Sequence, residues 1–378
     1  MNPRSLVWIG LGIVALGGAG FAGWLLSRPA ATAATDAPPI PQQEADATVD
    51  ALKPPKRQRP VIAVIGINDA TETTDYILPT GILRRADVAD VVMVATGRGR
   101  VSLFPALTVE PDATTAEFDA RNPEGADYVI VPAMSRDDDP AALQWISSQS
   151  AKGATIIGVC FGVKVVAAAG LLDDKRGTTH WYALQELRRK HPSMRYVPNR
   201  RLVVDGNIAT TTGITASIPM SLTLIEAIAG RDKATAVARE IGLSHWDARH
   251  ASDAFKFTRP FATTVLGNTL AFWNRDKLGI ELAAGLDEVS LALAADAWSR
   301  TYRSHAVTLS TSADPIRSRN GVQLVPDELG ERWTGDRIEA FGDRAAAQAL
   351  DQALSDIASR YGKRTRYVVA MQLEYPRL

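Results

Sequence analysis

Residues 154–169 read ATIIGVCFGVKVVAAA and contain Cys160, the single cysteine of the 378-residue chain. The apolar run Ala154 to Val159 is typical of a buried strand, and the residues after Gly162 have helical spacing. Strand, small residue, nucleophile-type residue, glycine and helix is the order of a nucleophile elbow. Flanking glycines allow the sharp turn, and the helix N-terminus is expected to lower the thiol pKa. The alternative is a small cysteine packed in the sheet.

Outside this elbow, short apolar runs alternate with helical patterns. Strands are expected over 61–67, 91–95 and 127–132, and helices over 75–86 and 139–151. This alternation predicts an α/β, flavodoxin-like parallel sheet with helices on both faces. Functional groups of such sheets lie beyond the carboxyl ends of the strands, where Cys160 is expected.

The stretch 157–181, IGVCFGVKVVAAAGLLDDKRGTTHW, resembles the DJ-1/PfpI superfamily (class I glutamine amidotransferase-like). Within it, the amidase-like domain of GlxA-type regulators is the most similar branch. The resemblance continues through 202–227 and covers roughly residues 60–245. It therefore assigns the superfamily fold to a first domain, 60–250.

The resemblance implies three site residues. Cys160 would be the reactive thiolate, Asp75 the carboxyl group that touches it, and His180 a nearby proton carrier. From the residues alone, Asp75 is equally an ordinary helix N-cap and His180 an ordinary packed histidine. PfpI-type proteases carry His directly after the nucleophile, but this chain has Phe161, which disfavours protease activity.

The remainder of the chain, 255–378, lacks the pair of helix-turn-helix motifs with which GlxA-type regulators continue. Instead, 306–311 lines up with 91–96, and 324–327 lines up with 109–112. We interpret 255–378 as a degenerate half-repeat of the first fold without the elbow, with chance similarity as the alternative. Its strands are expected to pack on the first domain or to extend its sheet. The candidates for that interface are Trp246, Trp273, Trp298 and Trp333.

The N-terminal region predicts a membrane anchor. Residues 1–5 form a short tail, and the segment 6–27 includes 21 consecutive uncharged residues, Leu6 to Leu26. At ~1.5 Å per residue, this helix spans a ~30 Å hydrocarbon core. A cleaved signal peptide is the alternative. The Ala-, Pro- and Thr-rich stretch 28–59 is expected to be a disordered linker. A bacterial-type inner membrane protein is implied, single-pass, with a periplasmic body favoured over a cytoplasmic one.

Composition limits the chemistry. The 42 basic and 42 acidic residues balance, so direct binding of nucleic acid is not expected. One cysteine excludes an intramolecular disulfide and a multi-cysteine zinc site. The five histidines show no metal-ligand spacing, and we predict no cofactor and no metal.

Three functions remain open. The first is a membrane-anchored small-molecule or redox sensing and binding protein that uses Cys160. The second is a Cys-dependent hydrolase, hydratase or glyoxalase-like enzyme for a small carbonyl or amide substrate. The third is a regulator related to GlxA-type transcription factors. The implied partners are the lipid bilayer through the N-terminal helix, an unidentified small ligand and a second copy in a homodimer.

Overall fold

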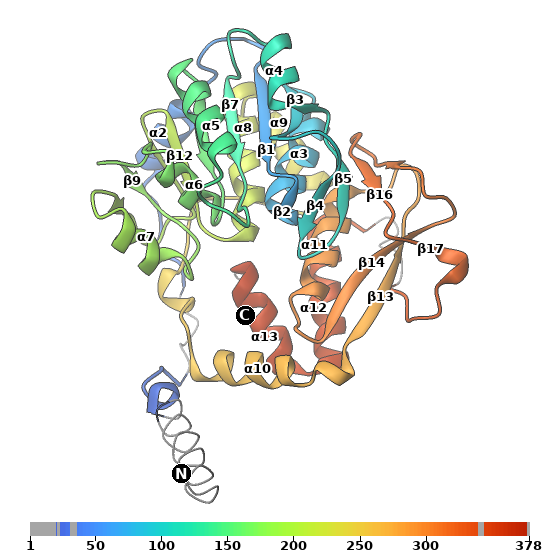
Figure 1. Ribbon diagram of the computed structural model, residues 1–378. Helices are drawn as coiled ribbons and strands as arrows, with labels where there is room; N and C mark the ends of the chain where they lie inside the picture. Colours follow the sequence, from blue (N-terminus) through green and yellow to red (C-terminus); the bar gives the residue numbers. More distant parts are fainter. Residues whose placement is uncertain (1–19, 21–22, 31–35, 339–343, 376–378) are drawn as a thin grey trace, which may run out of the picture.

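A seven-stranded sheet lies at the centre of the computed structural model (Figure 1). The structure describes residues 20, 23–30, 36–338 and 344–375. Its strand order is β11-β12-β8-β7-β1-β3-β6, and every neighbouring pair is parallel except β11 with β12. The strands are β1 (Val61–Gly66), β3 (Asp90–Ala95), β6 (Ala113–Thr114), β7 (Tyr128–Val131), β8 (Thr155–Gly158), β11 (Leu202–Asp205) and β12 (Ile208–Thr211). The predicted flavodoxin-like sheet is confirmed.

Helices cover both faces of this sheet. Ile62 and Val64 of β1 pack in one buried cluster with α3 (Thr73–Ala86), α8 (Ser217–Ala229) and α9 (Arg231–Glu240). Ala63 and Ile65 point the other way, into a cluster with α4 (Thr115–Arg121), α5 (Pro140–Ala151) and α6 (Gly162–Ala168). Because successive strand residues face opposite sides, a continuous apolar run such as β1 serves both layers.

Residues 255–378 contribute a smaller α/β unit. Strands β13 (Asp276–Glu281) and β14 (Ser304–Ser310) are parallel and are connected by α11 (Glu288–Ser299). Strand β17 (Glu328–Leu329) pairs with β14 and completes a separate three-stranded sheet. The other helices of this unit are α10 (Arg259–Leu270), α12 (Ala346–Tyr361) and α13 (Lys363–Leu373).

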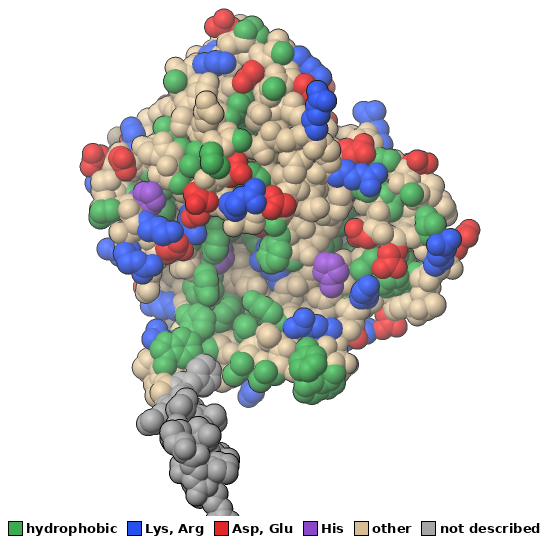
Figure 2. Space-filling model, in the orientation of Figure 1, with side chains coloured by type: hydrophobic (Ala, Val, Ile, Leu, Met, Phe, Trp, Pro, Cys, Tyr) green, Lys and Arg blue, Asp and Glu red, His purple; other side chains and the backbone are tan. Residues whose placement is uncertain are grey.

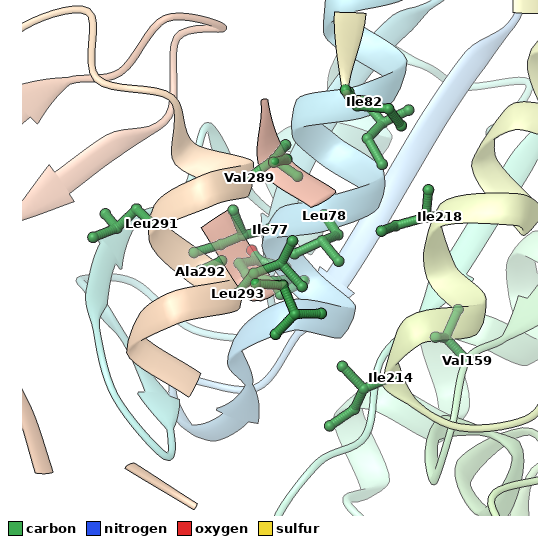
Figure 3. Close-up of a cluster of buried hydrophobic side chains, with 14 of the residues drawn as sticks. Ile77, Leu78, Ile82, Val159, Ile214, Ile218, Val289, Leu291, Ala292 and Leu293 are labelled. Carbon is green, nitrogen blue, oxygen red and sulfur yellow. The ribbon is translucent and has the colours of Figure 1, made fainter. Parts of the chain in front are cut away.

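The two units meet through helices rather than through one shared large sheet. Figure 3 shows Ile77 and Leu78 of α3 beside Val289 and Leu293 of α11 in one buried cluster. The contact is close at Gly81, where an added Cβ would lie 2.5 Å from the Glu288 carboxylate. A side chain at position 81 would have to displace the side chains of Glu288 and Val289, so glycine favours this close approach of α3 and α11.

A second junction is a small five-stranded sheet, β15-β16-β5-β4-β2. Its strands from the first unit are β2 (Asp69–Glu72), β4 (Val101–Phe104) and β5 (Thr108–Glu110), and those from the second are β15 (Ile316–Arg317) and β16 (Gln323–Val325). Strand β16 pairs with β5 in antiparallel fashion, with Leu324 opposite Val109. The expected extension of a sheet thus occurs here, in the small sheet and not in the central one.

Two sequence expectations need correction. Residues 28–59 were expected to be disordered throughout, but Gln42–Ala51 form helix α2. Its position is fixed by tertiary contacts, because Glu44 pairs with Arg200 at 2.5 Å and the Leu52 carbonyl accepts a 2.7 Å bond from Tyr128. Such contacts stabilise a helix that lacks apolar periodicity of its own. Trp273, an expected interface residue, is 76% exposed.

The predicted membrane segment 6–27 lies largely outside the described residues, which include only Gly20 and residues 23–27 of it. Across the described part of the chain, no helix combines the length and the apolar character that a membrane span requires.

Candidate functional site

Cys160 lies at a tight bend between β8 and α6. Its φ is 55°, a left-handed value that few non-glycine residues adopt. Gly162 makes the bend feasible, because a Cβ there would lie 1.9 Å from the carbonyl oxygen of Val131. The Cys160 carbonyl accepts a 3.0 Å bond from Thr179 Oγ1, and its N–H donates to Thr211 Oγ1 at 3.3 Å. The backbone therefore has the geometry expected of a nucleophile elbow.

The thiol is nearly enclosed, with Cys160 only 4% exposed. Burial raises the pKa of the Cys160 thiol well above its ordinary value, and the carboxyl groups of Asp75 and Glu72 raise it further. The expectation that the helix N-terminus lowers this pKa is therefore not met. Loss of water and nearby acidic groups outweigh the partial positive charge of a short helix.

Asp75 is completely buried in the first turn of α3, close enough to act on the thiol. Its Oδ2 accepts a 3.1 Å bond from the Ala133 N–H, and its Oδ1 has no hydrogen-bond partner among the described residues. Burial raises the pKa of Asp75 to about 8, although the Ala133 N–H and Arg300 oppose the shift. At neutral pH, Asp75 is therefore mostly a neutral carboxylic acid.

The N-cap of α3 is Glu72, not Asp75. Glu72 accepts bonds from the Asp75 N–H at 2.6 Å and from Arg300 Nη2 at 2.6 Å. Burial, followed by the charges of Asp75 and Asp296, raises the pKa of Glu72, and Arg300 counteracts this. Because Arg300 bonds Glu72 directly, we assign the negative charge to Glu72 and the proton to Asp75.

Arg300 comes from the second unit, at the end of α11, and it reaches the first unit's site. It also pairs with Asp296 at 2.7 Å. Both carboxylates and the guanidinium are largely removed from water, with the Arg300 side chain 12% exposed. Removing either partner of such a group leaves a buried charge uncompensated.

His180 lies beside the elbow, with its ring 5.1 Å from the ring of Phe161. Nδ1 accepts a 3.1 Å bond from the Tyr182 N–H, so Nε2 carries the proton and donates to the Gln372 carbonyl at 3.0 Å. Burial lowers the pKa of His180, which keeps the ring neutral. Both ring nitrogens are thus hydrogen-bonded to backbone groups. This favours a packed histidine with a structural role over a proton carrier.

Glu374, near the end of the chain, closes the back of the site. Its carboxylate accepts 2.8 Å bonds from the N–H groups of Trp181 and Gly213. Burial raises the pKa of Glu374, but His180, His250 and the two N–H donors outweigh it and leave the pKa below its usual range. A side chain at Gly213 would meet Glu374 and His180 at 2.7 Å.

A pocket of about 730 Å³ opens above Cys160. Its walls are mainly aromatic and aliphatic. They include Phe161, Trp181 and Tyr182 of the first unit, and Phe257, Phe261 and Val265 from α10 and the residues before it. Polar groups converge at its floor, namely Glu72, Cys160, His180, Arg300 and Gln372. In Figure 2, hydrophobic side chains surround a recess on this face of the molecule. An apolar pocket with a few convergent polar groups is the usual form of a small-molecule site.

Among the described residues, no group of three or more His, Cys, Asp or Glu side chains could hold a metal ion. Sequence reasoning named Cys160, Asp75 and His180. Cys160 and His180 line this pocket, whereas Asp75 is completely buried near the thiol and does not line it. Sequence reasoning missed Glu72, Arg300 and Glu374. Arg300 and Glu374 have no local pattern that marks them, because they arrive from a unit more than 100 residues away along the chain.

A parallel α/β sheet with a buried cysteine elbow at its carboxyl edge defines the class of this protein. Residues 61–227 match the model of the DJ-1/PfpI family. The predicted resemblance to this family is confirmed.

Curated relatives come from several functional groups. The isonitrile hydratase of Pseudomonas putida is 41% identical over 105 residues, 28% of this chain and 44% of the hydratase. The HTH-type transcriptional regulator GlxA of Rhizobium meliloti is 28% identical over 172 residues, 44% of this chain and 50% of the regulator. The Parkinson disease protein 7 homolog of Danio rerio is 24% identical over 180 residues, 46% of this chain and 93% of that protein. This chain thus spans half or less of the length of the two bacterial relatives.

Among solved structures, Drosophila melanogaster DJ-1beta aligns with 49% of this chain and with all of its own, at 23% identity and a TM-score of 0.44.

Proposed function

We propose that this protein binds a small, largely apolar molecule in the pocket above Cys160, and that the thiol forms a reversible covalent bond with it. The observation that carries the proposal is the placement of one buried cysteine at the floor of an aromatic pocket. Apolar walls supply affinity through burial of the ligand, and the polar floor orients its reactive group.

The protonation of Cys160 disfavours redox sensing. Peroxide reacts with a thiolate, whereas burial raises the pKa of the Cys160 thiol and keeps it protonated. A neutral thiol beside a neutral Asp75 suits addition to a polarised carbonyl. The S–C bond forms, the C=O π bond opens, and the thiol proton goes to the carbonyl oxygen. Release is the reverse of this step.

An n-alkyl aldehyde series tests the proposal. Binding to the full chain in detergent should quench or shift the emission of Trp181 and slow the alkylation of Cys160 by iodoacetamide. Ala262→Phe narrows the pocket and should abolish both effects. Thr263→Phe is the matched control, because Thr263 is an exposed residue of the same helix that does not line the pocket. Equal binding by Ala262→Phe and the wild type would eliminate this pocket as the site.

A second candidate is hydration of an isonitrile-like substrate, which the similarity to an isonitrile hydratase favours. The Cys160 thiol would add to the terminal carbon, with an S–C bond formed and the thiol proton transferred to that carbon. Water would then add to the C=N bond, and cleavage of S–C would return the thiol and release an N-alkylformamide. Turnover of an alkyl isonitrile that persists in Cys160→Ser would exclude this reaction. A regulatory role is not favoured by any feature of the described site.

We also propose that 255–378 is a partial second copy of the first unit. The order and direction of β13, α11 and β14 are those of β1, α3 and β3. Strand β16 pairs with β5, its expected counterpart. The glycines between the last two helices of each unit also have similar backbone angles: φ is 87° and ψ 166° at Gly230, and φ is 89° and ψ 159° at Gly362.

We retain the anchor over 6–27 as a proposal as well, with the body of an inner membrane protein on the periplasmic side. The uncharged run Leu6 to Leu26 supports it. A homodimer is likewise a proposal. Sedimentation of the full chain in detergent tests the dimer, and protease protection in right-side-out vesicles tests the orientation.

A further inference from the structure

The surface of α10 and the turn after it is strongly apolar. Leu266, Leu270, Phe272 and Trp273 are 40%, 57%, 67% and 76% exposed. Single exposed hydrophobic residues are ordinary, but a run of large ones on one helix and its next turn marks an interaction surface. Figure 2 shows hydrophobic side chains gathered along the lower edge of the molecule, where Figure 1 places α10.

The charge of this segment is one-sided. Between Arg259 and Arg275 the sequence RPFATTVLGNTLAFWNR contains two arginines and no acidic residue. An amphipathic helix with Trp, Phe and Leu on its exposed side and basic residues at its ends is suited to the headgroup region of an anionic bilayer.

The predicted anchor meets the described domain at this same surface. The Pro29 carbonyl accepts a 3.0 Å bond from the Arg259 N–H, at the start of α10. The Trp24 ring lies 5.6 Å from the ring of Phe257, and Leu26 is 68% exposed. The uncharged run Leu6 to Leu26 therefore joins the domain beside α10, so a bilayer that held this run would lie against that face.

We propose that α10, together with Phe272 and Trp273, is a second membrane contact that seats the domain on the surface of an anionic bilayer. Leu266 and Tyr182, 40% and 58% exposed, belong both to the outer surface and to the lining of the Cys160 pocket. The pocket mouth is thereby placed at the headgroups. This step rests on the proposed function: the ligand is then a lipid-soluble molecule that enters the pocket from the bilayer.

The membrane contact is tested with the full chain in phosphatidylglycerol–phosphatidylcholine vesicles whose acyl chains are brominated near the headgroup. Bromine quenches tryptophan at short range, so Trp273 should be quenched. Trp273→Phe should reduce the quenchable emission, whereas Trp145→Phe, at a buried position of α5, should not. Unchanged quenching in Trp273→Phe would overturn the contact. So would shielding of Trp273 that depends on protein concentration in detergent, because a second copy would then cover the surface.

The route of the ligand is tested by loading n-decanal from vesicles and, separately, from detergent micelles. The double variant Phe272→Glu, Trp273→Glu adds two anions next to an anionic surface and should slow loading from vesicles by about tenfold or more, with no change from micelles. Equal loading from vesicles would contradict the route. If decanal fails to occupy the pocket even from micelles, the proposed function fails, whereas Trp273 quenching still decides the membrane contact.

Discussion

Arg300 Nη2 donates a 2.6 Å bond to Oε1 of Glu72, 228 residues earlier in the chain. This bond connects the second unit to the floor of the pocket in the first. Arg300 also holds Asp296, so one guanidinium offsets two buried carboxylates beside Asp75 and Cys160. The second unit is thus part of the site, because without it the acidic floor would have no positive charge to balance it.

Replacing Arg300 should therefore destabilise the whole protein. Arg300→Met leaves Glu72 and Asp296 buried without a cationic partner, and we expect a loss of roughly 3–5 kcal/mol in the free energy of unfolding. The matched control is Arg360→Met, because Arg360 also pairs with two carboxylates, Asp276 and Asp336, but at the surface. The control should lose about 1 kcal/mol or less. Urea unfolding followed by tryptophan emission measures both, and equal losses would contradict the role of the buried triad.

Asp75 should make stability depend on pH. Its folded pKa of about 8 lies above the unfolded value, so the folded state binds more protons between those two pKa values. The contribution is therefore complete in acid and is lost as the pH rises toward 8. Asp75→Asn keeps an acceptor for the Ala133 N–H without the charge, and above pH 8 it should be more stable than wild type by roughly 1–3 kcal/mol. Unfolding measured at pH 6 and pH 9 should show a flatter profile for the variant. A steeper one would refute the assignment.

The Cys160 thiol should lose its proton only at high pH. Burial and the nearby carboxyl groups raise the pKa of Cys160, so its alkylation rate should still be rising above pH 9 rather than reaching a plateau near neutrality. Removing the Asp75 charge should shift this profile to lower pH, because the carboxylate that forms near pH 8 repels the thiolate. Glu328→Gln, at an exposed pair with Lys277, is the control and should leave the profile in place. The measurement is the iodoacetamide rate between pH 6 and pH 10.5.

The sequence predicted the features that depend on local patterns. The continuous apolar runs of β1 and β8, the helix α3 and the glycines around Cys160 all carry short-range signals of period and turn chemistry, and the structure has them where they were expected. The raised thiol pKa could not be predicted in this way. It depends on burial and on the through-space charge of Glu72, neither of which spacing along the chain reveals.

The interface between the units shows the same limit. Glycine is unfavourable inside a helix, and only the approach of Glu288 shows why Gly81 suits this position. Glu374 was missed for the same reason, because its carboxylate is held by the N–H groups of Trp181 and Gly213, which lie far away along the chain. Helix α2 was missed because its contacts with Arg200 and Tyr128 come from distant segments.

The elbow itself gives the sharpest test of the fold around the cysteine. In Gly162→Ala, the added methyl group would lie 1.9 Å from the Val131 carbonyl oxygen, a backbone atom that cannot move aside without disturbing β7. We expect a loss of roughly 3 kcal/mol or more and a change in Cys160 accessibility. Gly267→Ala is the matched control, because Gly267 lies within α10 with no atom within 4 Å of the new Cβ. It should be neutral or stabilising by roughly 0.5–1 kcal/mol, since alanine is the better helix former. Thermal unfolding together with the rate of Cys160 alkylation distinguishes the two variants, and a Gly162→Ala protein as stable as wild type would mean that the turn at Cys160 is not built as described.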